Sequence, residues 1–191
     1  SFANIFSDAG ITFLKNRLTK ISFKENSLEF SDELKLSYQY LVICTGSIPN
    51  SFLIKGVEEN CYFFNDLNDL NKLKSFLKKS QKTSYQQKLF IVGGGTSGIE
   101  LACKIKDILI DQFEIHIIEK SNEILNRNTI FNREEAEKAL KKRKIKVLLN
   151  SKVEEVSETK IHISSQSGIT SLDKDVVIWT AGVKPNLSYL E

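Results

Sequence analysis

The chain is poor in the residues that crosslink proteins or bind metals. Its 191 residues include no methionine, two prolines, three cysteines and two histidines. Cys44, Cys61 and Cys103 stand singly, without a C-x-x-C pair, so the sequence favours neither a disulfide framework nor a zinc site. His116 and His162 each lie alone within strand-like alternation, and we therefore expect no metal site. The absence of methionine, an initiator included, suggests an excised or processed piece.

Long apolar runs and a large net charge are also absent. No uninterrupted apolar run approaches the roughly 18 residues of a membrane span, and the N-terminus has no signal-peptide pattern. The 27 basic and 24 acidic residues give a net charge of +3, which is too small to indicate a nucleic-acid partner. We therefore expect a cytoplasmic protein with no membrane span in this chain and no nucleic-acid partner.

The most informative segment is a glycine-rich turn that follows a short apolar run. Leu89–Val92 leads into Gly93-x-Gly95-x-x-Gly98, which opens a helical pattern. We expect Gly93 to let the chain turn out of the strand, Gly95 to let a pyrophosphate approach the backbone, and Gly98 to let the helix pack closely. Unpaired N–H groups and the helix dipole favour an anion at the start of the helix, so no basic side chain is required there.

A carboxylate lies at the distance that a dinucleotide requires. Glu119 ends the apolar run Phe113–Glu119 and follows Gly98 by 21 residues, close to the ~20 typical of an acid that hydrogen-bonds the ribose hydroxyls. Such an acid repels a 2′-phosphate, and Lys120 is the only adjacent base, so the pattern favours NAD(H) over NADP(H). Strand, turn, helix and acid together predict dinucleotide binding; the alternative is a glycine-rich turn that binds nothing.

Helical and strand periodicities alternate around this turn. A helix is expected over Asn65–Lys79, with a core stripe formed by Leu67, Leu70, Leu73, Phe76 and Leu77. A later helix is expected over Arg133–Lys144, with Asn132 as N-cap and Glu135 in a variant of the capping box. The other expected elements are a helix over Ser97–Ile110 and strands over Leu89–Val92, Glu114–Ile118, Ile145–Leu149 and Val176–Trp179. This order predicts an α/β fold with a mostly parallel sheet, helices on its faces and a ligand at the carboxyl ends of its strands.

The chain also contains two versions of one strand pattern. The first copy is a strand over Ile11–Asn16, then three short strands, then Tyr40–Asn50. The second copy is Ile145–Asn150, then more alternating strands, then Val176–Asn186. Each copy ends with an apolar strand, then Thr-Gly or Thr-Ala-Gly, then a proline-containing turn. This self-similarity predicts two versions of one domain. Only the second copy has its glycine turn within these residues; the turn of the first would precede Ser1.

Taken in this order, the motifs resemble the pyridine nucleotide-disulfide oxidoreductase superfamily, the flavoprotein reductases with two dinucleotide domains. Gly93–Ala102 and Ile178–Val183 are most similar to type II NADH dehydrogenases, single-subunit FAD enzymes that pass electrons from NADH to quinone. The resemblance implies a doubly wound, mostly parallel Rossmann-like sheet with an antiparallel β-meander, plus the remnant of a second similar domain. Residues 1–60 would be the C-terminal part of an incomplete FAD-binding domain, and residues 61–191 the NAD(H)-binding domain.

The resemblance also assigns roles to individual residues. The NADH pyrophosphate would be held by Gly93, Gly94, Gly95, Thr96, Ser97 and Gly98, the adenosine ribose by Glu119, and the nicotinamide side by Thr180, Ala181 and Gly182. Thr45 and Gly46 would touch FAD. Glu100 would lie near the nicotinamide carboxamide or the flavin edge; the alternative is a helix acid favoured by the dipole. No general acid, base or nucleophile constellation is visible, so we name no catalytic residue.

Several parts of the family pattern fall outside these residues, among them the FAD phosphate loop, the quinone site and the membrane anchor. We therefore expect an incomplete FAD site, and NAD(H) binding without turnover. The whole protein would reduce a small-molecule acceptor, a quinone, from a peripheral position on the cytoplasmic membrane face, and a homodimer is left open. One alternative keeps the fold and changes the acceptor to a ferredoxin-like protein, nitrite reductase or a coenzyme A disulfide. Another is a non-catalytic NAD(H)-binding module.

Overall fold

The computed structural model describes residue 6 and residues 9–187. Two compact units divide the chain: residues 48–184 form the larger, and residues 1–47 with 185–191 form the smaller. Residues 48–60, which the sequence places with the first domain, belong to the larger unit in this division.

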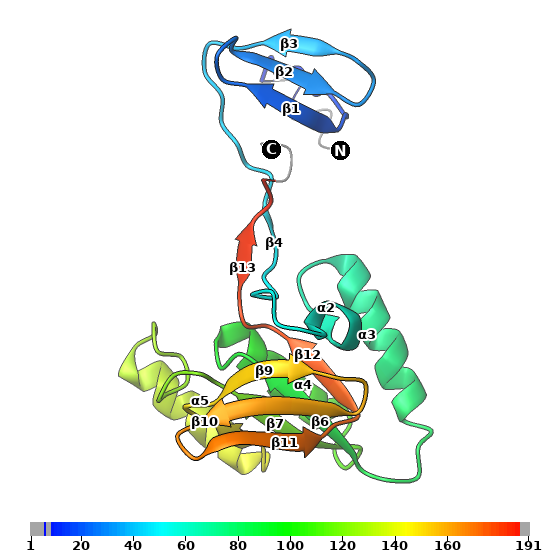
Figure 1. The fold of residues 1–191 in the computed structure, drawn as a ribbon, viewed down its shortest axis with the longest axis vertical. Helices are drawn as coiled ribbons and strands as arrows, with labels where there is room; N and C mark the ends of the chain where they lie inside the picture. Colours follow the sequence, from blue (N-terminus) through cyan, green and yellow to red (C-terminus); the bar gives the residue numbers. More distant parts are fainter. Residues whose placement is uncertain (1–5, 7–8, 188–191) are drawn as a thin grey trace. The chain divides into compact units, whose positions relative to one another are not determined.

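A five-stranded parallel sheet is the centre of the larger unit (Figure 1). Its strands, in spatial order, are β5 (Tyr62–Phe63), β12 (Val176–Trp179), β6 (Gln87–Val92), β7 (Phe113–Ile118) and β8 (Lys146–Leu148). Every neighbouring pair is parallel, with Leu89 opposite Val176 on one side and opposite Ile115 on the other. The α/β fold with a parallel sheet that the sequence predicts is confirmed.

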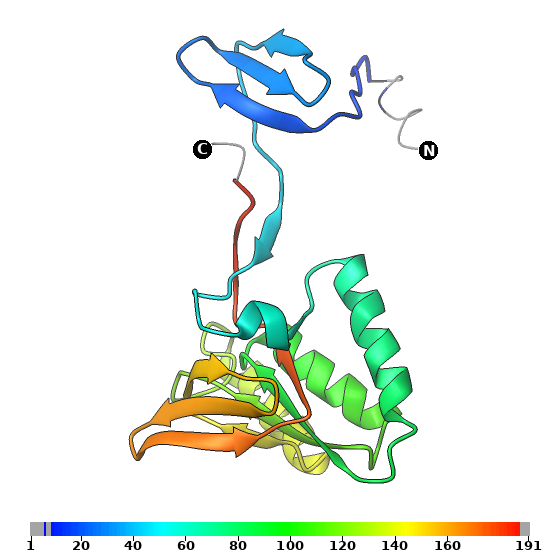
Figure 2. The ribbon, with the colours of Figure 1, turned by 45° about the vertical axis from the view of Figure 1, so that its right-hand side comes forward.

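Both faces of this sheet are covered, which explains why its strands read as continuous apolar runs. Leu89, Ile91 and their neighbours pack against three helices, α3 (Leu67–Ser80), α4 (Thr96–Ile108) and α5 (Ile130–Lys142). Phe90, Val92 and Trp179 pack on the opposite face against an antiparallel meander and a one-turn helix. These elements are β9 (Lys152–Val156), β10 (Lys160–Ser165), β11 (Gly168–Asp173) and α2 (Val57–Asn60). Figures 1 and 2 show the long helices on one side of the sheet and the meander on the other.

Helix α3 buries only part of its expected apolar stripe. Asp66 caps the helix by accepting a 2.8 Å hydrogen bond from the Asp69 N–H. Leu73 is buried in the core, with Phe76 and Leu77 packed beside it. The prediction is wrong for Leu67, which is 71% exposed, and for Leu70, which is also exposed. Both lie on the first turn of α3, before the buried Leu73, and the core beneath α3 begins at Leu73.

The start of α5 also differs from the prediction. The N-cap is Thr129, whose hydroxyl accepts a 3.3 Å hydrogen bond from the Asn132 N–H. The capping box expected at Asn132 and Glu135 is therefore wrong, and the helix begins at Ile130. Asn and Thr are both good N-caps. Here Thr129 is used, because the helix begins one turn earlier than predicted and the unpaired N–H is that of Asn132.

The smaller unit contains a meander that corresponds to β9–β11. It consists of β1 (Leu18–Ser22), β2 (Ser27–Phe30) and β3 (Lys35–Ser37), which pair antiparallel in chain order. The three short strands expected in the first copy are thus present. Two further short strands, β4 (Ser47–Pro49) and β13 (Val183–Pro185), pair with each other where the chain passes from one unit to the other.

The two outer strands expected in the first copy do not form. Ile11–Asn16 and Tyr40–Cys44 lie outside every strand that the structure describes, and Tyr40 is 91% exposed. An apolar run becomes a strand only when a neighbouring strand accepts its hydrogen bonds and covers its side chains. Among the described residues no strand lies beside either run, so their apolar pattern is present without the structure that it favours.

Candidate functional site

The glycine turn begins where β6 ends. Gly93 has φ +112°, a conformation that residues with a side chain rarely adopt. A Cβ at Gly93 would lie 3.0 Å from the backbone of Thr180 and of Ala181, which follow β12. The turn expected at Gly93 is therefore enforced twice, by the backbone angle and by the close approach of the chain after the neighbouring strand.

Gly98 allows helix α4 to sit directly on this turn. A Cβ there would lie 2.0 Å from the Gly93 carbonyl oxygen and 2.9 Å from Thr180 Oγ1. No side-chain adjustment relieves a contact with a backbone oxygen at that distance. The close helix packing expected at Gly98 is thus present in the structure.

The start of α4 is open. Gly95 is the N-cap, in an extended conformation with no side-chain cap, and a Cβ built on it would meet nothing within 4 Å. Thr96 and Ser97 are exposed and form the first turn, whose N–H groups have no acceptor within the helix. The N–H groups of Gly93 and Gly94 are already taken, by Ile118 O at 2.9 Å and by Glu119 Oε2 at 2.7 Å.

Glu119 follows β7 and lies against the turn. Its second oxygen accepts a 2.8 Å hydrogen bond from the Ser121 N–H, so both carboxylate oxygens are held by backbone donors. The Gly94 carbonyl in turn accepts from the Leu125 N–H at 2.9 Å, which ties the loop after β7 to the turn. The sequence singled out neither Ser121 nor Leu125, because both act through backbone N–H groups and their side chains give no signal.

Residues 180–182 follow β12 at the same edge of the sheet. The Thr180 hydroxyl donates to Val92 O at 2.9 Å, so it joins the ends of β12 and β6. Gly182 has φ +139°, and its carbonyl accepts from the Asn50 N–H at 3.0 Å. The structure thus brings together the glycine turn, Glu119 and the segment from Thr180 to Gly182.

The remaining predicted site residues lie apart from this group or make no contact with it. Glu100 is exposed on α4, beyond its first turn, and its carboxylate has no polar partner among the described residues. Thr45 and Gly46 belong to the smaller unit. There the Thr45 hydroxyl donates to Asn186 O at 2.9 Å, and Gly46 O accepts from the Asn186 N–H at 3.1 Å.

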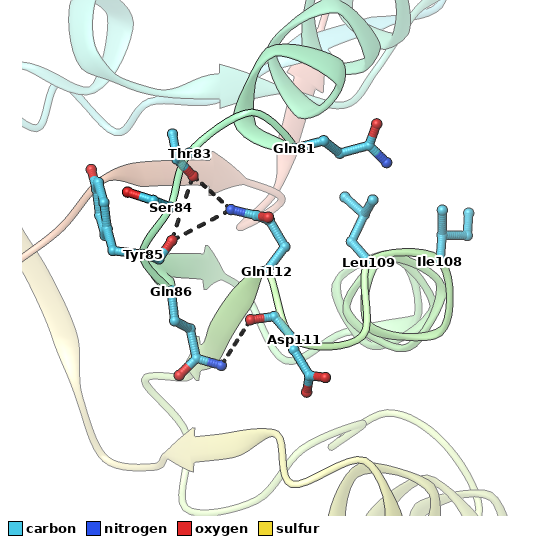
Figure 3. A pocket seen from close by; sticks show the side chains of 9 residues that line it. All are labelled: Gln81, Thr83, Ser84, Tyr85, Gln86, Ile108, Leu109, Asp111 and Gln112. Carbon is cyan, nitrogen blue, oxygen red and sulfur yellow. Dashed lines mark hydrogen bonds between the residues drawn. The ribbon is translucent and has the colours of Figure 1, made fainter.

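A polar hollow of about 460 Å³ lies at the opposite, amino-terminal edge of the sheet (Figure 3). It is lined by Gln81, Thr83, Ser84, Tyr85, Gln86, Ile108, Leu109, Asp111 and Gln112. Its polar groups bond one another: Gln112 Nε2 donates to Thr83 Oγ1 at 2.7 Å, and Gln86 Nε2 donates to Asp111 O at 3.2 Å. Ligands of parallel α/β sheets bind at the carboxyl edge, so we do not assign the nucleotide to this hollow.

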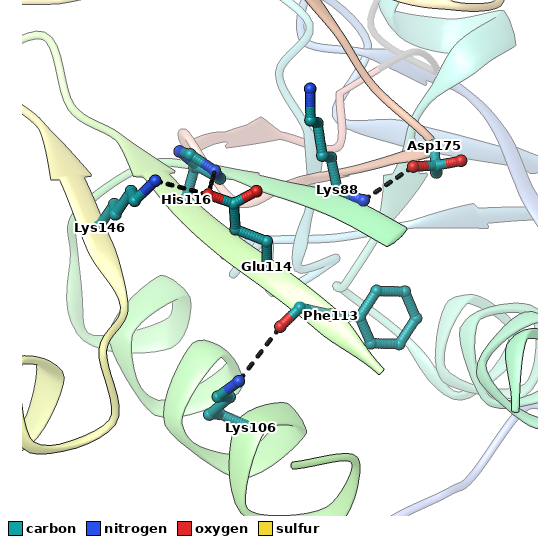
Figure 4. A network of polar contacts seen from close by, with 7 residues as sticks. All are labelled: Lys88, Lys106, Phe113, Glu114, His116, Lys146 and Asp175. Carbon is teal, nitrogen blue, oxygen red and sulfur yellow. Dashed lines mark hydrogen bonds and ion pairs between the residues drawn. The ribbon is translucent and has the colours of Figure 1, made fainter. Parts of the chain in front are cut away.

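Charged groups on β7 and β8 form a separate network (Figure 4). Glu114 pairs with Lys146 Nζ at 2.5 Å, and this hydrogen bond holds the pKa of Glu114 below its usual value. His116 stacks on Phe90, with 4.9 Å between ring centres, and its Nε2 lies 3.3 Å from Glu114 Oε1 without hydrogen-bond geometry. Burial lowers the pKa of His116, although Glu114 acts in the opposite direction. The network braces the sheet and does not reach the glycine turn.

A parallel sheet whose central strand ends in a glycine turn, with an acid after the next strand, defines the Rossmann class of α/β domain. The family model described as pyridine nucleotide-disulphide oxidoreductase matches residues 4–191. The chain belongs to this family, which confirms the resemblance drawn from its motifs.

Two curated relatives and one solved structure show how far the likeness extends. The chain is 31% identical over 189 residues to demethylphylloquinone reductase NdbB of Synechocystis sp., covering 95% of this chain and 46% of that protein. It is 26% identical over 219 residues to the alternative NAD(P)H-ubiquinone oxidoreductase C1 of Arabidopsis thaliana, covering 100% of this chain and 42% of that protein. A solved structure of NDH2 from Plasmodium falciparum in complex with NADH matches with a TM-score of 0.76 at 24% identity, over 91% of this chain and 41% of that one. This last likeness shows the fold. The chain spans less than half the length of these curated relatives.

Proposed function

We propose that the larger unit binds NAD(H) at the carboxyl edge of its parallel sheet. The observation that carries the proposal is an open helix start beside a fixed carboxylate. Nothing lies within 4 Å of the Cβ position at Gly95, and the Glu119 carboxylate is held against the same turn by the Gly94 N–H. The family match and the NADH complex of the Plasmodium relative support NAD(H), with FAD, as the cofactors.

The pyrophosphate would lie against the first turn of α4. Because the N–H groups of Gly93 and Gly94 already have acceptors, the donors left for it are those of Gly95, Thr96 and Ser97. The helix dipole adds a favourable interaction with the anion of about 0.3–1 kcal/mol. The missing Cβ at Gly95 gives the phosphate oxygens direct access to these donors.

Glu119 would bind the adenosine ribose. Each carboxylate oxygen uses one lone pair for a backbone N–H and keeps another for a ribose hydroxyl. A 2′-phosphate at the same place would meet the negative charge of Glu119, so we propose that NADH binds more tightly than NADPH.

The nicotinamide half would lie on the other side of β6, at residues 180–182. In the strand order β5-β12-β6-β7-β8, the turn after β6 separates the end of β7 from the end of β12, and a dinucleotide spans such a point. Bound NADH supplies a hydride from its nicotinamide ring. The chain's part is to bind and orient that ring. In the smaller unit the Thr45 hydroxyl donates to Asn186 O, its oxygen can also accept a hydrogen bond from FAD, and we derive no step through FAD.

For the whole protein we propose an FAD-dependent NADH dehydrogenase that reduces a quinone. The two curated relatives, a demethylphylloquinone reductase and an NAD(P)H-ubiquinone oxidoreductase, support this acceptor. No described helix is long and apolar enough to cross a membrane. The activity is tested by measuring NADH oxidation by the whole protein, with FAD and a quinone analogue. We expect the rate of NADH oxidation to depend on the quinone. A rate that is the same with and without the quinone would contradict the proposed acceptor.

Nucleotide binding is tested by calorimetric titration of the chain with NADH and NADPH. We expect NADH to bind more tightly, and Glu119→Arg to weaken NADH by about tenfold, or 1.4 kcal/mol, while reducing the discrimination against NADPH. Glu137→Arg is the matched control, because Glu137 is exposed on α5 and the substitution changes the charge equally. Unchanged selectivity in Glu119→Arg would remove Glu119 from the site, and failure of the wild-type chain to bind either nucleotide would contradict the proposal.

A further inference from the structure

The loop that follows β4 carries backbone strain beside the candidate site. Phe52 and Leu53 have φ +53° and +56°, so two consecutive residues with side chains adopt the left-handed conformation. Each such residue costs about 1–2 kcal/mol. Strain of this kind persists only where the surroundings enforce it, and it is concentrated at functional sites.

Asn50 makes three hydrogen bonds, two that tie the strained loop to β12 and the chain that follows it, and one within the loop. Its N–H donates to Gly182 O at 3.0 Å, its carbonyl accepts from Trp179 Nε1 at 2.9 Å, and its Oδ1 accepts from the Phe52 N–H at 2.9 Å. Behind the loop, the buried Ser51 hydroxyl donates to Glu58 Oε1 at 2.9 Å. The loop is therefore held rigidly, and it is held by the strand end where we place the nicotinamide.

The side chains of this loop do not account for its strain through packing. Leu53 is 95% exposed and Phe52 is 52% exposed, so neither gains the burial that stabilises a core residue. The Phe52 ring does make one close approach: its tip lies 3.4 Å from the position of a Cβ at Gly182. The loop thus places an aromatic ring against bare backbone at Gly182, with about half of the Phe52 surface exposed.

We propose that Phe52 is a positioning residue whose ring forms one wall of the place for the nicotinamide of NAD(H). The inference rests on the proposed function, since it needs the nicotinamide half beside Gly182. A flat nicotinamide ring can pack against the Phe52 ring face or edge, as aromatic pairs do. Asn50 fixes the Phe52 backbone before the nucleotide arrives, so only the side chain has to be ordered on binding.

The test compares NADH with ADP-ribose, which has the adenosine and pyrophosphate but no nicotinamide. We expect Phe52→Ala to raise the Kd for NADH about tenfold, given that aromatic pairs contribute up to about 1.5 kcal/mol beyond burial, and to leave the Kd for ADP-ribose within twofold. Phe52→Tyr should restore NADH affinity. Leu53→Ala is the matched control, because Leu53 is the next residue, shares the backbone conformation and is almost fully exposed; it should change neither Kd.

A second readout reports on the nicotinamide alone. Trp179 is the single tryptophan of the chain, and its emission overlaps nicotinamide absorption, so bound NADH should quench it and ADP-ribose should not. In Phe52→Ala the quenching at saturating NADH should be weaker, because the ring is less well placed. Phe52→Leu serves where the alanine variant does not fold.

The outcomes separate the two proposals. If the wild-type chain binds neither NADH nor ADP-ribose, the proposed function fails and this inference fails with it. If the wild-type chain binds both and Phe52→Ala leaves NADH affinity unchanged, only the role of Phe52 is refuted. An equal loss of NADH and ADP-ribose affinity in Phe52→Ala and Phe52→Leu would show a merely structural residue and would also overturn the inference.

Discussion

Backbone hydrogen bonds decide which amides of the glycine turn remain for a ligand. The motif suggests that residues 93–98 all serve one purpose, to bind the pyrophosphate, but in the structure its glycines have different roles. Gly93 and Gly98 allow β6, α4 and the chain after β12 to pack, whereas Gly95 leaves the helix start open. Substitutions at these glycines should therefore have different consequences.

Gly98→Ala should destabilise the fold by about 3 kcal/mol, the upper end of the usual cost of overpacking, because its Cβ would press on the Gly93 carbonyl oxygen and a backbone atom has no easy relief. Gly95→Ala should lower the free energy of unfolding by no more than about 1 kcal/mol, the cost of alanine at a helix N-cap, yet weaken NADH at least tenfold by placing a methyl group where the pyrophosphate approaches. Urea unfolding and calorimetry measure the two effects. A stable Gly98→Ala, or a Gly95→Ala with wild-type NADH affinity, would contradict this division of roles.

A partly buried histidine gives the larger unit a pH-dependent stability. Burial lowers the pKa of His116 in the folded state, against the opposing effect of Glu114, and Lys146 and Lys88 add positive charge nearby. Between that lowered pKa and the ordinary value of about 6.5, the unfolded chain binds more protons than the folded chain. The free energy of unfolding should therefore fall as the pH drops below 6.5.

His116→Gln should remove this part of the pH dependence, whereas His162→Gln, which alters the other histidine, should keep it. The measurement is urea unfolding at a series of pH values above about 5, where paired carboxylates contribute little. Equal slopes in wild type and His116→Gln would show that His116 is not the group responsible.

At the scale of elements, the sequence predicts a helix or strand well wherever the residues of that segment alone determine its structure. The helix α4 and the strands β6 and β7 follow from the glycine turn and from apolar runs that are buried on both faces. The start of α5 was predicted wrongly because two residues, Thr129 and Asn132, are both suited to capping. The choice between them depends on where the loop after β7 ends, and that loop is fixed by the Leu125 bond to Gly94.

The cap assignment is itself testable. Thr129→Ala should lower the free energy of unfolding by about 1 kcal/mol, since it removes the acceptor for the Asn132 N–H. Asn132→Ala should be neutral or slightly stabilising, because alanine is the better helix former inside α5. Denaturation midpoints at unchanged m-value give both numbers. A larger loss in Asn132→Ala than in Thr129→Ala would restore the capping box predicted from the sequence.

At the scale of the whole molecule, the duplicated strand pattern is only half realised. The second copy forms a complete sheet with a meander on one face, whereas the first copy forms the meander β1–β3 and leaves Tyr40–Cys44 without a neighbouring strand among the described residues. Periodicity indicates which segments are able to form strands. It does not show whether a partner strand is present, and this is why the prediction failed there.

The loop at Phe52 could not have been predicted for a different reason. The left-handed backbone of Phe52 and Leu53 depends on residues far away in the sequence. Asn50, just before them, is bonded to Trp179 and to Gly182. No glycine marks Phe52 or Leu53 as turn positions. Such contacts appear only when the whole larger unit is assembled.

The most direct test of nucleotide binding at the carboxyl edge is a crystal structure of the chain with NADH. We predict the pyrophosphate within hydrogen-bond distance of the N–H groups of Gly95, Thr96 and Ser97, the adenosine ribose on Glu119 and the nicotinamide beside Gly182. NADH bound elsewhere, for example in the polar hollow at the amino-terminal edge, or a start of α4 that stays closed to it, would contradict the account.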